Sequence, residues 1–213
     1  MTTRDYLVID LEATCDDAGA VPRREMEIIE IGAVLVDGQT LCPKREFQRF
    51  VRPLRHRTLT PFCRQLTSIT QAEVDGAATF PEVIAELRAF MYDDGGRPRF
   101  CSWGAYDRGQ FEQDARFHGV ALPFTDHLNL KAGFSRVLGT RKRYGMAGAL
   151  RRLGLPLEGT HHRGIDDARN IAKILPFIVG AQPIPAPGEA PGQRRSVSRG
   201  ADRSARRGRK RRR

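Results

Sequence analysis

Two acidic residues near the start of the chain, Asp10 and Glu12, are spaced so that both could act at one place. They lie at the end of an apolar run, residues 6–10, that predicts a β-strand. Side chains at positions i and i+2 of a strand project from the same face, which puts the two carboxylates roughly 7 Å apart along the chain. Two like charges this close are unfavourable unless a cation offsets them, and Mg²⁺ prefers such oxygen ligands. The pair alone is also compatible with a polar strand end that faces water.

A third acid, Asp107, follows a predicted strand over residues 99–102 and opens a segment with helical spacing. An acid at this point is often an ordinary helix N-cap, because its carboxylate accepts hydrogen bonds from free backbone N–H groups. Taken alone, Asp107 therefore favours a structural interpretation.

The last group of reactive side chains lies at the start of a predicted helix, in residues 161–167 (HHRGIDD). Asp166 and Asp167 would lie in the first helical turn, where the helix dipole stabilises acids, so a structural role could explain both. His162 lies in a polar loop beside Gly164, and an imidazole with a pKa of about 6.5 is suited to act as a general base. A solvent-exposed loop histidine is the alternative interpretation.

These residues and their order resemble the DEDDh group of 3′-to-5′ exonucleases, in the superfamily that includes RNase T and DNA polymerase III epsilon. The resemblance covers about residues 6–180. Three motifs of the group are matched in order by Asp10 with Glu12, by Asp107, and by His162 with Asp167. The spacing of the third motif favours Asp167 over Asp166. The full set in this order is highly specific.

Finer features are similar to the histone-mRNA 3′-exonuclease-like subgroup. Four segments carry this likeness, and they are residues 9–15, 59–70, 102–104 and 162–167. The Arg-rich end of the chain is not part of the pattern of that subgroup.

The resemblance implies an α/β chain with an RNase H-like fold, in which helices flank a central mixed five-stranded sheet. It also implies hydrolysis of the terminal phosphodiester at the 3′ end of a single-stranded nucleic acid. RNA is favoured over DNA as the substrate, and nucleoside 5′-monophosphates are the products. Two Mg²⁺ ions, for which Mn²⁺ can substitute, would lie about 3.5–4 Å apart and clamp the scissile phosphate.

Under this resemblance each reactive residue has a role. Asp10 would bridge both ions, while Glu12 and Asp167 would complete the shell of the first ion. Asp107 would hold the second ion. His162 would take the proton from the attacking water, and Glu12 would help to align that water.

Four further residues are implied as contacts of the terminal nucleotide, together with His162. The backbone at Ala13 and Thr14 would meet its sugar and phosphate. Phe62 and Trp103 would stack on bases, each stack contributing about 1–3 kcal/mol, with ordinary core packing as the alternative for both. The implied partners are 3′ ends of single-stranded RNA or DNA, and a homodimer is a further expectation because related folds include dimers.

Strands are expected early in the chain and helices later. The apolar patterns predict strands over Tyr6–Asp10, Glu27–Val36, Phe47–Val51 and Arg99–Ser102. Helices are predicted from Thr79 to Met91 and over Asp107–His118, Leu130–Leu138, Met146–Leu153 and Gly164–Val179. Asp37-Gly38 indicates a hairpin turn between the second and third strands. This order favours an α/β layer with a partly antiparallel sheet.

Positive charge is concentrated towards the C-terminus. Residues 181–213 hold 11 of the 36 basic residues and 2 of the 25 acidic residues, so 9 of the net 11 positive charges fall there. We expect an exonuclease domain over residues 1–180, a Pro-rich linker over 181–192 and a disordered Arg-rich tail over 193–213. The tail is predicted to bind nucleic-acid backbones by electrostatic attraction, and a tail that only improves solubility is the alternative.

The composition argues against several classes of protein. The four cysteines lie far apart with no Cys-x-x-Cys pair, which argues against a zinc ribbon or a disulfide framework and indicates free thiols. No apolar run is long enough to span a bilayer, and the charged residues near the start argue against a signal peptide. We therefore expect a cytoplasmic protein that does not enter a membrane.

Two other functions fit parts of the sequence. A non-catalytic nucleic-acid-binding protein would explain the basic tail, but it leaves the acids and His162 unexplained, since acids without a metal repel phosphates. A proofreading or RNA-maturation subunit that needs a partner would instead use the tail to dock on a larger complex.

Overall fold

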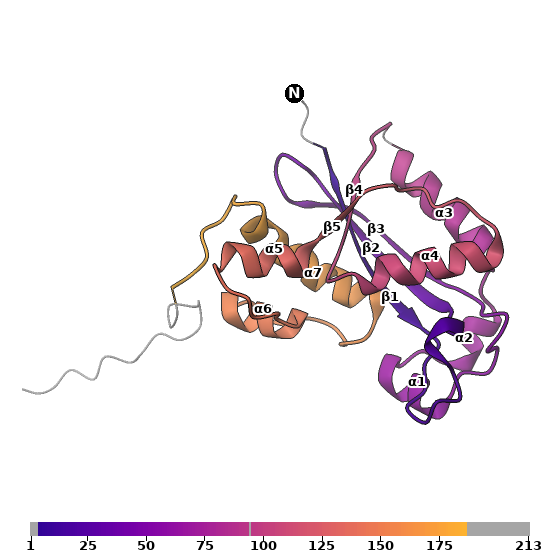
Figure 1. Cartoon of the computed structure of the whole chain (residues 1–213). Helices are drawn as coiled ribbons and strands as arrows, with labels where there is room; N and C mark the ends of the chain where they lie inside the picture. The colour runs from indigo at the N-terminus through magenta and orange to yellow at the C-terminus, as the bar shows by residue number, and fades with distance from the viewer. Residues whose placement is uncertain (1–3, 94, 187–213) are drawn as a thin grey trace, which may run out of the picture.

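The computed structural model describes residues 4–93 and 95–186 and has a five-stranded sheet at its centre (Figure 1). The strands are β1 (Tyr6–Ala13), β2 (Ile28–Val36), β3 (Pro43–Phe50), β4 (Arg99–Ser102) and β5 (His127–Asn129). They lie in the order β3-β2-β1-β4-β5. The β3·β2 and β2·β1 pairs are antiparallel, and the β1·β4 and β4·β5 pairs are parallel. The mixed five-stranded sheet expected from the sequence is confirmed.

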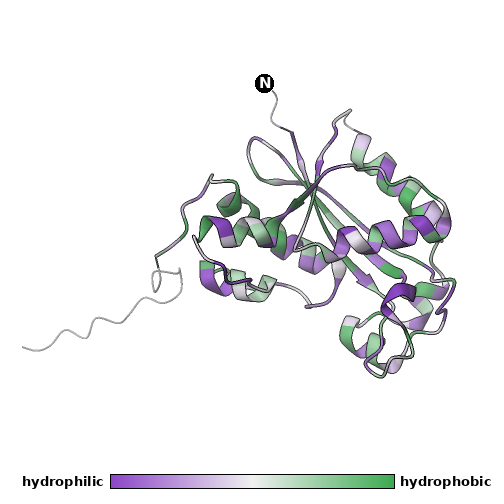
Figure 2. Ribbon diagram, viewed as in Figure 1, coloured by the Kyte–Doolittle hydropathy of each residue, from purple (hydrophilic) through white to green (hydrophobic). Residues whose placement is uncertain are grey.

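Helices cover both faces of this sheet. They are α1 (Pro61–Thr67), α2 (Gln71–Asp75), α3 (Phe80–Tyr92), α4 (Tyr106–His118), α5 (Leu130–Val137), α6 (Met146–Leu153) and α7 (Gly164–Ile178), with a short 3₁₀ turn η1 (Arg23–Glu25). One apolar core joins α3 and α4 to the sheet, a second joins α5, α6 and α7 to its other face, and a third joins α1 and α2 to β2. In Figure 2 apolar residues follow the central strands, while the helices mix apolar and polar residues.

Besides the turn η1, three elements have no counterpart in the sequence patterns, namely α1, α2 and β5. The caps of the two helices are nevertheless present in the sequence. Thr60 Oγ1 accepts a hydrogen bond from Cys63 N at 3.0 Å, and Thr70 forms a capping box with Glu73. β5 has only three residues and pairs with β4. Elements this short contain too few residues for a period to be recognised.

The start of the predicted linker contacts the domain. Ile184 packs against the core around α5, α6 and α7, and Arg152 Nη1 donates to Pro185 O at 2.9 Å. The rest of the linker and the Arg-rich tail over 193–213 lie outside the described residues, so those expectations stay predictions. Among the helices of the described ranges, none combines the length and the apolar character needed to cross a membrane.

β1 separates two environments by simple alternation. The face towards α3 and α4 carries Leu7, Ile9 and Leu11. Val8 lies in the core on the α7 side, and alternation carries Asp10 and Glu12 onto that same face. The strand continues to Ala13, three residues beyond the predicted end, so Glu12 lies inside it. The strand thus directs two carboxylates towards α7.

β2 and α7 approach each other closely at two glycines. A Cβ added at Gly32 would lie 2.1 Å from both Gly164 C and Ile165 N. A Cβ added at Gly164 would lie 3.0 Å from Asp10 O and 3.2 Å from Gly32 N. Because these neighbours are backbone atoms, they cannot rotate aside as a side chain can. Glycine at both positions therefore lets α7 begin directly against β1 and β2.

We expect Gly32→Ala to destabilise the protein by about 1–3 kcal/mol or more, because the new methyl group overlaps backbone on the facing helix. The free energy of unfolding from urea titration measures this loss.

Gly148→Ala in α6 is the matched control. Its added Cβ would lie 3.7 Å from the nearest atom, Tyr144 Cδ1, which is ordinary contact. Alanine in a helix is favoured over glycine, so this variant should gain about 0.5–1 kcal/mol. Equal stability of the two variants would contradict the close contact of β2 and α7.

Candidate active site

Three carboxylates meet where the end of β1 faces the first turn of α7. Asp10 and Glu12 come from β1 and Asp167 comes from α7, and one ligand oxygen from each lies within 4.8 Å of the others. Glu12 is 8% exposed and Asp167 is 4% exposed, while Asp10 is half-buried. Residues more than 150 positions apart in the chain thus form one acidic cluster.

Asp107 reaches the same region from the opposite face of the sheet. It lies in the first turn of α4 and is 4% exposed. β4 pairs with β1 only as far as Val8, and beyond that point Asp107 Oδ1 accepts a hydrogen bond from Leu11 N at 3.2 Å. Asp107 therefore replaces the missing strand partner and is fixed beside Asp10. It is not the N-cap, which is Ala105.

The carboxylates repel one another in this partly buried site. Burial raises the pKa of Asp10 well above its usual value, and the charges of Asp107 and Glu12 raise it further. Burial, followed by the charge of Asp167, raises the pKa of Glu12 to about 9. Burial also raises the pKa of Asp107 to about 6, although hydrogen bonds to its ionised form limit the rise.

A divalent cation fits this set of donors. Each raised pKa reflects a negative charge that its surroundings do not fully offset, and a bound cation would favour the ionised forms. The cluster offers only carboxylate oxygens, which are the ligands that Mg²⁺ and Mn²⁺ prefer.

Two adjacent histidines adjoin the acidic cluster. His161 Nδ1 lies 2.9 Å from Asp167 Oδ2, and the backbone N–H of His162 donates to the same oxygen at 3.0 Å. Their rings stack with centroids 4.0 Å apart. His162 has a φ of +65°, a left-handed conformation that is uncommon outside glycine and often found at functional sites.

The His162 side chain is half-buried, and burial lowers its pKa, with the neighbouring His161 lowering it further. Its imidazole is therefore neutral at pH 7 and can accept a proton. The sequence pattern indicated His162 but gave no role to His161. The only available signal was that the two histidines are adjacent.

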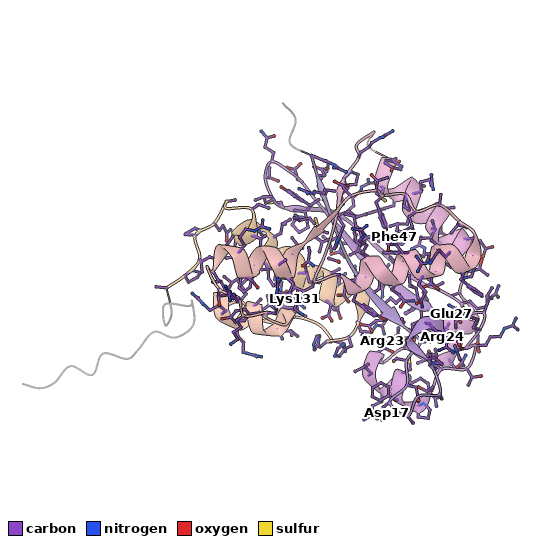
Figure 3. All side chains as sticks on the ribbon, in the orientation of Figure 1. Asp17, Arg23, Arg24, Glu27, Phe47 and Lys131 are labelled. Carbon is purple, nitrogen blue, oxygen red and sulfur yellow. The ribbon has the colours of Figure 1, made fainter. Side chains whose placement is uncertain are left out.

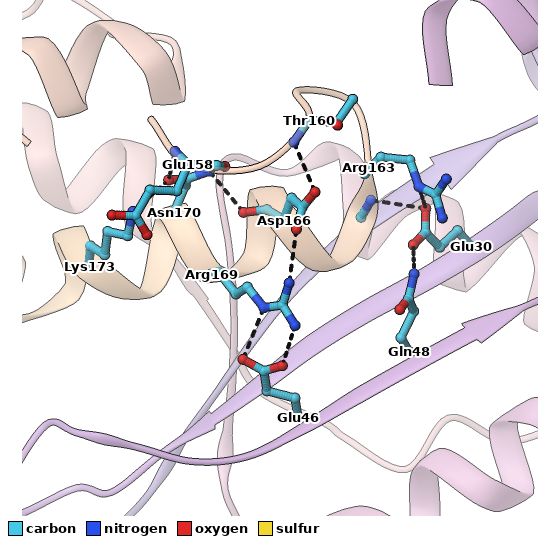
Figure 4. Close-up of polar contacts among 11 residues, drawn as sticks. Glu30, Glu46, Gln48, Glu158, Thr160, Arg163, Asp166, Arg169, Asn170 and Lys173 are labelled. Carbon is cyan, nitrogen blue, oxygen red and sulfur yellow. Dashed lines mark hydrogen bonds and ion pairs between the residues drawn. The ribbon is translucent and has the colours of Figure 1, made fainter. Parts of the chain in front are cut away.

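A buried glutamate anchors the segment that carries His162 and Asp167 (Figure 4). Glu30 on β2 is fully buried and accepts hydrogen bonds from Gly164 N at 3.0 Å and Gln48 Nε2 at 2.7 Å. Its Oε2 also lies 3.4 Å from Arg163 Nε, and the Arg163 guanidinium lies over the Phe50 ring. Glu30 therefore fixes the two residues that follow His162 in the chain. The sequence signal was an acid inside an Ile-rich strand.

Asp166 belongs to a different network, which links α7 to β3 (Figure 4). Its side chain accepts from Thr160 N at 2.9 Å and from Arg169 Nη1 at 2.9 Å. Arg169 in turn pairs with Glu46 on β3. Of the two adjacent aspartates, Asp167 is the one that the structure brings to the acidic cluster.

The predicted nucleotide contacts differ in how far their side chains are already used within the protein. Thr14 is buried, and its Oγ1 and N–H both bond the backbone of Glu27, at 2.9 and 2.8 Å. Trp103 Nε1 donates to Tyr144 O at 3.1 Å. Phe62 is half-buried on α1. The side chain of Thr14 is thus used within the protein, while Phe62 and Trp103 each keep part of their surface accessible.

The arrangement is suited to phosphate-ester chemistry. An acidic cluster of this kind holds divalent cations that attract a phosphate, and a neutral imidazole beside it can take a proton from water.

Comparisons with known proteins agree with this interpretation. A family model described as Exonuclease matches residues 7–175. The mouse (Mus musculus) protein ERI1 exoribonuclease 3 is 34% identical over 179 residues, which cover 80% of this chain and 52% of the relative. The chain thus spans about half the length of that curated relative.

Two solved structures are similar in fold and sequence. The nuclease domain of 3'hExo, described as a DEDDh family member bound to rAMP, has a TM-score of 0.78 and 29% identity, covering 84% of this chain and 93% of that chain. A structure described as 3'-end specific recognition of histone mRNA stem-loop by 3'-exonuclease has a TM-score of 0.77 and 29% identity, with 83% and 64% covered.

We expect the stability of the cation-free protein to fall as the pH rises. The pKa of Glu12 is about 9 in the folded state against 4.5 ordinarily, so between these values the folded protein holds a proton that the unfolded chain releases. The free energy of unfolding therefore decreases through this window. Thermal melting in EDTA, with and without added Mg²⁺ or Mn²⁺, should show cation stabilisation that grows with pH.

Glu12→Gln is the control for this effect, because glutamine does not titrate. The variant should lose less stability with rising pH and gain less from the cation. The same cation effect at every pH in both proteins would contradict the explanation.

Proposed function

The chain belongs to the exonuclease family, within the DEDDh 3′-5′ exonuclease superfamily, and on that premise we propose that it degrades single-stranded RNA from the 3′ end. The reaction would hydrolyse the terminal phosphodiester and release nucleoside 5′-monophosphates. The observation that carries this proposal is the meeting of Asp10, Glu12 and Asp167 beside His162. A site of this composition combines cation binding with a proton acceptor.

RNA is the proposed substrate because the similar proteins point to it. The mouse relative is named an exoribonuclease, and one similar structure was solved with rAMP bound. Another concerns recognition of a histone mRNA stem-loop. These are properties of those proteins, and they favour RNA over DNA for this one.

The four carboxylates would hold two Mg²⁺ or Mn²⁺ ions, with Asp10 shared between them, Glu12 and Asp167 on one and Asp107 on the other. When bound, the ions would supply positive charge that polarises the scissile phosphate and offsets charge developing on it. Asp107 is positioned by Leu11 N, and Asp167 by the N–H of His162 and the ring of His161.

His162 is proposed as the general base. Its lowered pKa leaves the imidazole neutral, so its free ring nitrogen would accept the proton from the attacking water. Glu12 would help to orient that water. Glu30 supports this step indirectly, because it holds the backbone of Gly164 two residues after His162.

The Arg-rich tail over 193–213, outside the described residues, is proposed to contact the backbone of the same nucleic acid. Its charge would add affinity that weakens with salt and that does not depend on sequence.

A gel assay of 5′-labelled RNA and DNA strands of equal sequence tests the activity. With Mg²⁺ or Mn²⁺ we expect a ladder that shortens from the 3′ end, faster for RNA, and none in EDTA. Asp107→Asn is the control and should abolish the ladder.

Other results would favour the other functions. Strands that are bound on a native gel but never shortened would indicate a non-catalytic binding protein. Weak activity restored by a polymerase or ribosomal fraction would indicate a partner-dependent subunit.

Replacing each histidine separately tests the base. His162→Ala should lower kcat by at least about 100-fold while RNA binding is kept, because the proton acceptor is lost. The rising limb of the pH–rate profile should also disappear. His161→Ala leaves His162 in place and should reduce kcat far less. The reverse order of effects would assign the base to His161.

A further inference from the structure

A second feature lies immediately beside the acidic cluster. A cavity of about 330 Å³ opens between η1 and the start of α4, and it is lined mainly by Arg23, Arg24, Met26, Tyr106, Gln110 and Gln113. This volume is at the lower end of the range for sites that bind small ligands, about 300–1,000 Å³. Tyr106 directly precedes Asp107, and after burial the charges of Asp107 and Glu12 raise the pKa of Tyr106, so this side of the cavity lies near the acidic cluster.

The chemistry of this cavity suits a nucleotide. Arg23 and Arg24 are both exposed, and Figure 3 shows them next to each other beside the start of α4. Arg24 makes an ion pair of 3.3 Å with Glu25 at the surface, where such pairs are weak. Tyr106 is 42% exposed, which leaves much of its ring accessible. Cationic groups beside an exposed aromatic ring are the features with which proteins bind single-stranded nucleic acids.

The backbone of the turn that carries the two arginines is tied to α4. Gln110 and Gln113 on α4 donate from Nε2 to Met26 O at 2.9 and 2.7 Å. Gln113 Nε2 also lies 3.3 Å from Arg23 O. The helix that carries Asp107 therefore ties down the 3₁₀ turn that carries the arginines.

Position and charge together indicate an occupant. Cations held by the acidic cluster would contact the scissile phosphate, so the other phosphates of a bound strand need cationic groups elsewhere on the surface. The arginine cavity supplies such groups at the first turn of α4, the same turn that carries Asp107.

We propose that this cavity binds the nucleotide on the 5′ side of the scissile bond. Its phosphate would contact Arg23 and Arg24, and its base would stack on Tyr106. The inference rests on the proposed function, because it assigns a second subsite to the same reaction. It names residues that would contact an oligonucleotide strand but not an isolated terminal nucleotide.

Two substrates separate this subsite from the catalytic centre. One is an oligoribonucleotide, and the other is a p-nitrophenyl ester of a nucleoside 5′-monophosphate, which has no 5′ neighbour. In the double variant Arg23→Ala/Arg24→Ala, the ratio of kcat/KM for the oligonucleotide over the ester should fall about tenfold, equivalent to about 1.4 kcal/mol. The salt dependence of oligonucleotide binding should flatten by about 0.7 in log–log slope for each lost phosphate contact.

The double variant Arg116→Ala/Arg136→Ala is the matched control. It removes the same charge from exposed positions on α4 and α5 and should keep the wild-type ratio. An unchanged ratio in the Arg23/Arg24 variant, or an equal fall in the control, would overturn the subsite.

Failure of the proposed function is recognised separately. If the wild-type protein cleaves neither substrate, that function is wrong. Fluorescence anisotropy of a labelled oligonucleotide in EDTA then tests, independently of cleavage, whether the cavity binds the strand. The subsite is supported if the Arg23/Arg24 variant binds about tenfold more weakly while the control binds like the wild type. Equal binding by the two variants overturns the subsite.

Discussion

The start of α7 touches β2 backbone to backbone, because Gly32 and Gly164 both lack a Cβ. Glu30, on the same face of β2, accepts a hydrogen bond from Gly164 N and pairs with Arg163, so the helix is held by both shape and charge. Asp167 lies in the first turn of α7 and consequently meets the end of β1. Asp167 in turn contacts both histidines that precede the helix. A displacement of α7 would separate the acidic cluster into its two halves.

This anchoring has an electrostatic cost. Asp10, Glu12 and Asp107 are brought together in a partly buried site, and their raised pKa values record the repulsion. Glu30, by contrast, is fully buried but is matched by two hydrogen-bond donors and an arginine. The contrast separates a structural acid, which is satisfied within the protein, from the acids that remain available to a ligand. Groups whose pKa is shifted by burial and by one another cluster at functional sites.

The acidic and basic side chains near the site occupy separate positions. The acidic cluster lies at the meeting of β1 and α7, while Arg23 and Arg24 lie at the rim beside α4. Residues 1–180 have a net charge of only about +2, so local arrangement rather than overall charge must guide a polyanionic strand to this site. The same helix positions Asp107 and, through Gln110 and Gln113, the arginine cavity. One helix therefore positions both Asp107 and the turn that carries Arg23 and Arg24.

Local patterns in the sequence predicted many of the strands and helices, the family and most of the acidic site. Alternation in β1 put Asp10 and Glu12 on one face, the apolar stripe of α7 predicted its length, and the ordered motifs predicted the family and the mixed sheet. Only the tertiary structure decided that Glu30 anchors α7, that His161 contacts Asp167, and that the arginines of η1 adjoin α4. The reason is the range of the interactions. A repeat of two or 3.6 residues is visible within a few turns of chain, whereas Glu30 and Gly164 are 134 residues apart and meet only when the sheet and helix pack.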